Sequence, residues 1–192
     1  METIFSLWAE GFDLPILDWM QTNLANPFLD KVMPIITLLG DAGIFWIIIA
    51  VALMLLPKYR KIGFGMAVSL LIGLVVCNLA MKPLFHRIRP YDYQLIHFGK
   101  EIPLLIEAQH DFSFPSGHTI ASFEAATAIT VRNKKWGVAA FVLAILIAFS
   151  RIYLYVHYPT DVICSMILGA LIGLLGCKIV DMAERKIIAH KK

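Results

Sequence analysis

Long apolar segments with few charges are the feature that most restricts how this chain can fold. Residues 62–81 and 162–180 are close to the length of about 20 apolar residues that a helix needs to cross a bilayer. Residues 136–156 form a third such segment, and only 16% of the 192 residues are charged. Soluble domains contain about 25% charged residues. The sequence therefore predicts an all-α fold, a polytopic bundle of membrane-spanning helices.

Two further segments are less clear as spans. Residues 42–56 are short, but the apolar turns of residues 32–40 extend them. Residues 117–131 contain several polar side chains and are expected to face the interior of the bundle. We count about five membrane-spanning helices, with six as the alternative.

The first 26 residues mix apolar side chains at helical spacing with acidic ones, and they carry no basic segment typical of a signal peptide. We expect an amphipathic helix in the membrane interface at residues 1–26, anchored by Trp8 and Trp19. The whole chain, 1–192, is interpreted as a single membrane domain whose helix core covers residues 62–182.

Basic residues indicate the orientation. Ten of the 17 lysines and arginines lie in two polar connections, residues 57–61 and 132–135, and in the C-terminal tail, residues 185–192. The positive-inside rule places these segments in the cytoplasm. With five spans the loop 83–116 and the turn 157–161 then lie outside the cytoplasm.

Other classes are disfavoured. A net charge of +3 without a basic stripe gives no indication of nucleic-acid binding. The three cysteines lack Cys-x-x-Cys spacing, so neither a disulfide framework nor a metal site is expected.

Lys82 and Arg89 form the first of three polar motifs at the ends of these spans. Seven residues apart, they return to one helical face about 10 Å apart along the axis. Pro90 biases Arg89 out of the helix, so both cations can converge on one anion. The alternative is a pair of cations reaching the membrane boundary, and Arg87 is expected to be such an interfacial charge.

The second motif, Pro115 to His118, precedes an apolar helical run. Ser116 is a good N-cap residue, and Gly117 allows close approach to the backbone. The unpaired first amides of a helix bind anions. A nearby anion would favour protonated His118. A capped helix start with an interfacial histidine is the alternative.

The third motif contains Arg151, His157 and Asp161. His157 lies about 240° around an ideal helix from Arg151, so the chain must leave the helix between them, and Pro159 marks the start of the next one. Asp161 could then hold one imidazole N–H and leave the other nitrogen nucleophilic. The alternative is a capping aspartate beside an interfacial histidine.

Together, the motifs place three cations, two histidines and a carboxylate on one side of the membrane. Polar groups of this kind are unfavourable in hydrocarbon, so they are expected to serve a function unless they are paired with one another. The pattern Lys-x6-Arg-Pro, Pro-Ser-Gly-His and Ser-Arg-x5-His-x3-Asp resembles that of the type 2 phosphatidic acid phosphatase family, the integral-membrane lipid phosphatases related to vanadium haloperoxidases. This sequence matches every motif position.

The resemblance implies residue roles. His157 would attack phosphorus to give a phosphohistidine, oriented by Asp161, and His118 would protonate the leaving oxygen and later activate water. Lys82, Arg89, Ser116, Gly117 and Arg151 would hold the phosphate oxygens, and neither a metal nor another cofactor is expected.

The expected function is hydrolysis of a lipid phosphate or diphosphate at the outer membrane face. Undecaprenyl pyrophosphate is the first candidate substrate, followed by phosphatidic acid and phosphatidylglycerol phosphate, and membrane lipids are the expected surroundings. A vanadate-dependent haloperoxidase and a non-enzymatic anion-binding membrane protein are the alternatives. Glu124 is expected to make a structural contact inside the bundle, with Asn78 as a candidate partner.

Overall fold

The computed structural model describes residues 2–190, and side chains from residue 4 onward. Its elements are α1 (Glu2–Trp8), the π-helical η1 (Ala9–Asp13), α2 (Leu14–Asn23), α3 (Pro27–Leu38), the 3₁₀ turn η2 (Asp41–Gly43), α4 (Ile44–Leu55), α5 (Arg60–Leu74), the π-helical η3 (Val75–Met81), α6 (Lys82–Phe85), α7 (Pro90–Phe98), α8 (Gly117–Arg132), α9 (Lys134–Tyr153) and α10 (Pro159–Ala189). Within the described range there is no β-strand. The all-α prediction is confirmed.

Proline and asparagine define where several helices begin. α3, α7 and α10 each have proline at the first position, where its missing N–H removes no helical hydrogen bond. Asn26 caps α3 by accepting from the amides of Phe28 and Leu29 at 3.1 and 3.0 Å. Asn133 separates α8 from α9 and accepts from Trp136 N–H.

Helix α8 is the centre of the bundle. It packs against α5, α9 and α10, and it contributes Ala125, Ala126 and Ala128, all fully buried. Small side chains let helices approach closely, which is the usual basis of helix association in membranes. Large apolar side chains are instead exposed on the outer faces of α4, α9 and α10, as expected where lipid surrounds the helices.

Three helical stretches are long and apolar enough to cross a membrane: Arg60–Phe98, Lys134–Tyr153 and Pro159–Ala189. The pair Pro27–Leu38 and Asp41–Leu55, bent by 41°, makes a fourth if it is one span. α8 has only 16 residues, so the predicted count of five spans stays a prediction. Its place at the centre of the bundle agrees with the expectation that this segment faces the interior.

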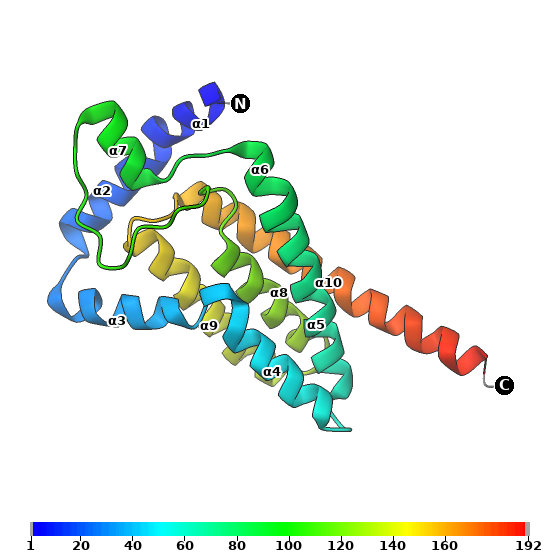
Figure 1. Cartoon of the computed structure of the whole chain (residues 1–192). Coiled ribbons are helices and arrows are strands. Elements are labelled where there is room, and N and C mark those ends of the chain that lie inside the picture. Colours follow the sequence, from blue (N-terminus) through cyan, green and yellow to red (C-terminus); the bar gives the residue numbers. More distant parts are fainter. Residues whose placement is uncertain (1, 191–192) are drawn as a thin grey trace.

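The N-terminal segment is helical but is interrupted by the π-helical turn η1. Leu14, Leu17 and Met20 are buried in a cluster with Tyr153 and Tyr155, whereas Trp19 is 56% exposed. In Figure 1, α1, α2 and α7 lie at one end of the molecule, and the last turns of α10 extend beyond the bundle at the other. The position of the N-terminal helices in the membrane interface stays a prediction.

Candidate active site

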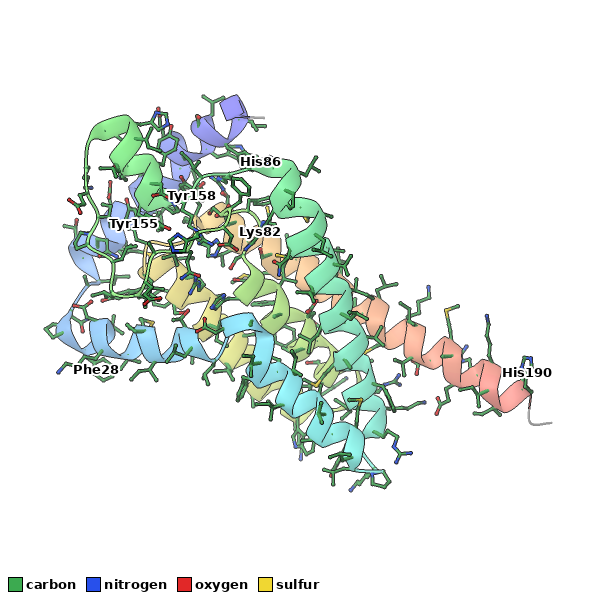
Figure 2. All side chains as sticks on the ribbon, in the orientation of Figure 1. Phe28, Lys82, His86, Tyr155, Tyr158 and His190 are labelled. Carbon is green, nitrogen blue, oxygen red and sulfur yellow. The ribbon has the colours of Figure 1, made fainter. Side chains whose placement is uncertain are left out.

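A cavity of about 650 Å³ lies between α4, α5 and α8 and reaches the loops at one end of the bundle. Residues from all three sequence motifs line its polar end: Lys82, Arg89, Gly117, His118, Arg151 and His157. In Figure 2, Lys82 lies at the same end of the molecule as Tyr155 and Tyr158, the residues on either side of the segment that contains His157. The predicted convergence of the three motifs is therefore what the fold produces.

Arg89 lies directly beside His157. It precedes α7 in extended conformation (φ −77°, ψ 155°), as expected for a residue before proline. Its Nη1 donates to the carbonyl oxygen of Val156 at 2.7 Å and lies 3.4 Å from Nε2 of His157. The guanidinium is thus fixed next to the imidazole nitrogen that faces the cavity.

Lys82 and Arg89 share an anionic partner that was not predicted, Asp111 in the loop between α7 and α8. Its two carboxylate oxygens each pair with one of the cations. Partial burial by itself would raise the pKa of Asp111, but the hydrogen bonds and charges of Lys82 and Arg89 outweigh burial and hold the pKa well below its usual range. In this structure a carboxylate occupies the position predicted for a phosphate.

Arg151 is held from a different side. Near the end of α9, it is 1% exposed, and its Nη1 donates to Oγ1 of Thr37 at 2.6 Å. Its Nε has no hydrogen-bond partner in the part of the chain that the structure describes. The Thr37 contact thus holds one end of the guanidinium, while Arg151 still lines the cavity.

His157 lies in the connection between α9 and α10, where the predicted break occurs: α9 ends at Tyr153 and α10 begins at Pro159. Burial, together with the charges of Arg89 and Arg151, holds the pKa of His157 well below its usual range. A neutral imidazole carries a lone pair on one nitrogen, so this histidine is in the form that can act as a nucleophile.

Asp161 lies behind His157, in the first turn of α10. Its Oδ2 is 3.5 Å from Nδ1 of His157, too long for a strong hydrogen bond. The same carboxylate accepts from the Ser113 hydroxyl, from the Tyr158 N–H at 3.0 Å and from Arg87. It is thus close enough to orient the imidazole and is itself held by three donors.

The expectation that Arg87 is an interfacial charge is wrong. Arg87 is 3% exposed, pairs with both Asp161 and Asp13, and lies 3.8 Å over the ring of Tyr158. Asp13 in turn accepts from the backbone and side chain of Thr160. A buried arginine between two carboxylates satisfies both, and it ties the N-terminal segment to the start of α10.

His118 is paired with a second carboxylate that was not predicted. Its Nε2 lies 2.7 Å from Oδ1 of Asp41 in η2. The sequence did contain a signal for this partner: Asp41 is an acidic residue at the point where the apolar segments 32–40 and 42–56 are interrupted. The partner fixes the orientation of the ring at the cavity.

Ser116 lies behind the cavity surface. It occupies the N-cap position of α8, but its side chain makes no capping hydrogen bond. Its hydroxyl accepts from Thr119, and its N–H donates to Ser165 at 2.9 Å. Gly117 does line the cavity, so of this pair only the glycine is in place to meet a ligand.

Glu124 lines the same cavity deeper between the helices. It is 1% exposed, and Oε2 has no hydrogen-bond partner among the residues that the structure describes. No hydrogen bond joins it to Asn78 there, so the suggested partner is not found.

Comparisons with known proteins agree with the motifs. Residues 58–185 match the PAP2 superfamily model. The chain is 30% identical to an undecaprenyl-diphosphatase of Sulfolobus acidocaldarius over 70% of its own length and 63% of that protein's. It is also 30% identical to the undecaprenyl-diphosphatase BcrC of Bacillus subtilis, over 82% of this chain and 78% of the relative, and to phosphatidylglycerophosphatase B of the same organism, over 79% and 75%. The chain thus spans less than two thirds of the archaeal relative.

Solved structures agree on the fold. A transmembrane PAP2-type phosphatidylglycerolphosphate phosphatase from Bacillus subtilis superposes with a TM-score of 0.70 at 26% identity, covering 96% of this chain and 94% of that one. A bacterial vanadium-dependent iodoperoxidase gives 0.56 at 18% identity, covering 71% and 38%, and shows a likeness of fold alone. The chain is an integral membrane protein and, as its motifs predict, belongs to the PAP2 superfamily.

Proposed function

We propose that this protein is a lipid phosphatase that removes a phosphate head group through a phosphohistidine formed on His157. The observation that carries the proposal is the position of Nε2 of His157, at the cavity and 3.4 Å from Arg89, with Lys82 and Arg151 on the same cavity. The family and its phosphatase relatives support the class of enzyme.

In the first step, Nε2 of His157 attacks phosphorus and the bond from phosphorus to the leaving oxygen breaks. Lys82, Arg89, Arg151 and the N–H of Gly117 would hold the non-bridging oxygens, where fixed positive charge stabilises the transition state most. His118 gives its proton to the leaving oxygen. Asp161 stabilises the positive charge that develops on the His157 ring.

In the second step, a water molecule attacks phosphorus while His118 accepts its proton, and the bond between nitrogen and phosphorus breaks. Inorganic phosphate is released and both histidines return to their starting forms. A substrate phosphate must also displace the Asp111 carboxylate from Lys82 and Arg89, since both cations are paired with it in this structure.

The inner part of the cavity supports a lipid as the substrate. Below the polar end, α4 and α5 contribute only apolar side chains and one glycine, including Ile47, Met54, Leu70 and Leu74. A tail between these helices would place its head group at the motifs. Undecaprenyl pyrophosphate and phosphatidic acid or phosphatidylglycerol phosphate all fit this description, and relatives with either kind of name occur.

We further propose that the site lies on the extracytoplasmic side and the C-terminus in the cytoplasm, because eight basic residues of the described range, in residues 57–61, 132–135 and 185–190, lie in segments at the end of the bundle away from the motifs.

The test is phosphate release from this panel of lipids by purified protein in detergent micelles with EDTA present. Wild type should be active in EDTA, since Lys82, Arg89 and Arg151 supply the positive charge that a metal ion would otherwise provide. His157→Ala should lower turnover by about 10³-fold or more because the nucleophile is gone. His190→Ala, on the exposed C-terminal turn, is the matched control and should be unchanged.

Loss of wild-type activity in EDTA would contradict the metal-free mechanism. A His157→Ala variant that folds and releases phosphate normally would remove the nucleophile from the proposal, and absence of any lipid turnover by wild type would favour a non-enzymatic anion-binding protein.

A further inference from the structure

The inner part of the cavity contains one acidic side chain among apolar ones. The lining there comes from three helices: Ile47, Ala50, Val51 and Met54 of α4, Ala67, Leu70, Leu71 and Leu74 of α5, and Ile120 and Ala121 of α8. Glu124 of α8 lies among them. The mechanism above makes no use of this carboxyl group.

The environment of Glu124 leaves it without a protein partner. It is 1% exposed, and in the described part of the chain neither a cation nor a hydrogen-bond donor contacts Oε2. An unpaired carboxyl group at this depth destabilises the fold. Such a group is explained if a ligand supplies the missing hydrogen bond.

Helix α5 leaves space for this carboxyl group at Gly73. A Cβ atom at Gly73 would overlap both carboxyl oxygens of Glu124 and lie 2.7 Å from its Cδ. Gly73 lines the cavity as well. The space that holds the carboxyl group is therefore part of the space available to a ligand.

The distance from the proposed phosphate position is short. Glu124 follows His118 by six residues in α8, which is about 9 Å along a helix axis. Six residues are also about 240° around an ideal helix, so the two side chains leave α8 on different faces, yet both line the same cavity. A lipid with its phosphate at His118 and His157 would bring the first few bonds of its tail to Glu124.

Lipids differ in what they carry at that point. A diacylglycerol phosphate has two ester groups there, whose carbonyl oxygens accept hydrogen bonds. An isoprenoid diphosphate has only hydrocarbon beyond its phosphates. A neutral carboxyl group can donate its hydroxyl hydrogen to an ester carbonyl oxygen, whereas an isoprene chain offers it no acceptor.

We propose that Glu124 is a specificity-determining residue that hydrogen-bonds the glycerol ester region of the lipid, so that the enzyme prefers diacylglycerol phosphates to isoprenoid diphosphates. This inference rests on the proposed function, because it assigns the substrate class of the same cavity.

The test compares kcat/KM for phosphatidic acid and for farnesyl diphosphate, each in detergent micelles. Wild type should prefer phosphatidic acid. Glu124→Leu should lower kcat/KM for phosphatidic acid roughly tenfold or more and leave that for farnesyl diphosphate unchanged or higher. Glu124→Gln keeps a donor and an acceptor and should retain most of the preference.

Thr127→Val is the matched control. Thr127 is buried on the same helix, and its Oγ1 also has no partner among the described residues, yet it does not line the cavity. Its replacement should leave the ratio of the two kcat/KM values unchanged. Size-exclusion profiles and thermal unfolding in detergent would report whether each variant folds.

If Glu124→Leu does not fold, Gly73→Ala provides the second measurement, because its methyl group displaces the carboxyl group and should lower the ratio in the same direction. An equal loss with both substrates in a folded variant would show a packing role only and overturn the inference. A loss confined to farnesyl diphosphate, or a wild-type preference for it, would also overturn it. If wild type hydrolyses neither lipid, the proposed function itself fails. This outcome is seen with wild type alone, so it is distinguished from a failure of the Glu124 inference, which only the variants test.

Discussion

Asp111 is the residue that most changes the description of this site. Cations assembled to bind phosphate repel one another, and a carboxylate between Lys82 and Arg89 relieves this repulsion. The substrate then has to compete with an internal anion. Because the Asp111 side chain is 54% exposed, it can leave without opening the core.

Replacing this carboxylate should therefore strengthen anion binding. In Asp111→Asn the two cations keep their positions but lose the competing charge, so we expect vanadate, which imitates the transferring phosphoryl group, to inhibit with a Ki several-fold lower than in wild type.

The measurement is inhibition of phosphate release at several substrate concentrations. Glu107→Gln removes an exposed carboxylate from the same loop and serves as the control. A Ki that rises in Asp111→Asn would mean that Asp111 holds the cations in place for the ligand rather than competing with it.

At the scale of helices, the motifs lie where helices start or end. Lys82 begins α6, Arg89 precedes α7, Gly117 begins α8 and Arg151 is near the end of α9. Helix ends carry unpaired amides or leave room for loops, so polar groups there can meet at one place while the helix bodies stay apolar. The packing of these bodies then determines how accurately the ends meet.

Close packing of α10 on α8 is one such contact. A Cβ atom at Gly169 would lie 2.8 Å from the carbonyl oxygen of Ile120 and 3.0 Å from Cβ of Phe123, which leaves no room for a side chain. Gly169→Val should therefore lower the free energy of unfolding by about 1–3 kcal/mol, because the two helices must move apart.

Thermal unfolding in detergent measures this effect. Gly11→Ala is the control, since an added Cβ there meets nothing within 4 Å. Unchanged unfolding of Gly169→Val would contradict the packing argument. Activity should fall together with stability, because α8 carries His118 and α10 carries Asp161.

The whole molecule is polarised along the bundle. The Leu55–Arg60 connection and the end of α10 lie at one end, and the site with α1, α2 and α7 lies at the other (Figure 1). With 31 residues, α10 is about 46 Å long, more than the roughly 30 Å of a hydrocarbon core. If the membrane covers the start of α10, its basic last turns are expected to extend past the membrane at the end opposite the site.

Labelling of cysteines in intact cells tests the orientation. In a background with Cys77, Cys164 and Cys177 replaced, Lys100→Cys should react with a membrane-impermeant maleimide because its loop faces outward. Lys58→Cys, in the connection between α4 and α5, should react only after the cells are lysed. The reverse pattern would place the site in the cytoplasm.

Much of this architecture could be predicted from the sequence. Apolar length gave the class of fold, Pro159 gave the start of α10, and the spacing of Arg151 and His157 required the break that occurs between α9 and α10. The start of α4 and the number of spans were less accessible, because the segment around η2 is interrupted by a bend rather than by a loop.

By itself the sequence determined that this is a membrane helix bundle and that Lys82, Arg89, His118, Arg151 and His157 lie at helix ends, because these properties depend on local composition and on helical period. Only the tertiary structure decided that Asp111 pairs with Lys82 and Arg89. It also decided that Arg87 bridges Asp13 and Asp161 and that Glu124 lines the cavity. The physical reason is sequence separation: these ion pairs join residues 22, 29 or 74 positions apart. Such contacts depend on how each helix is rotated and where each loop runs, and no local pattern records either.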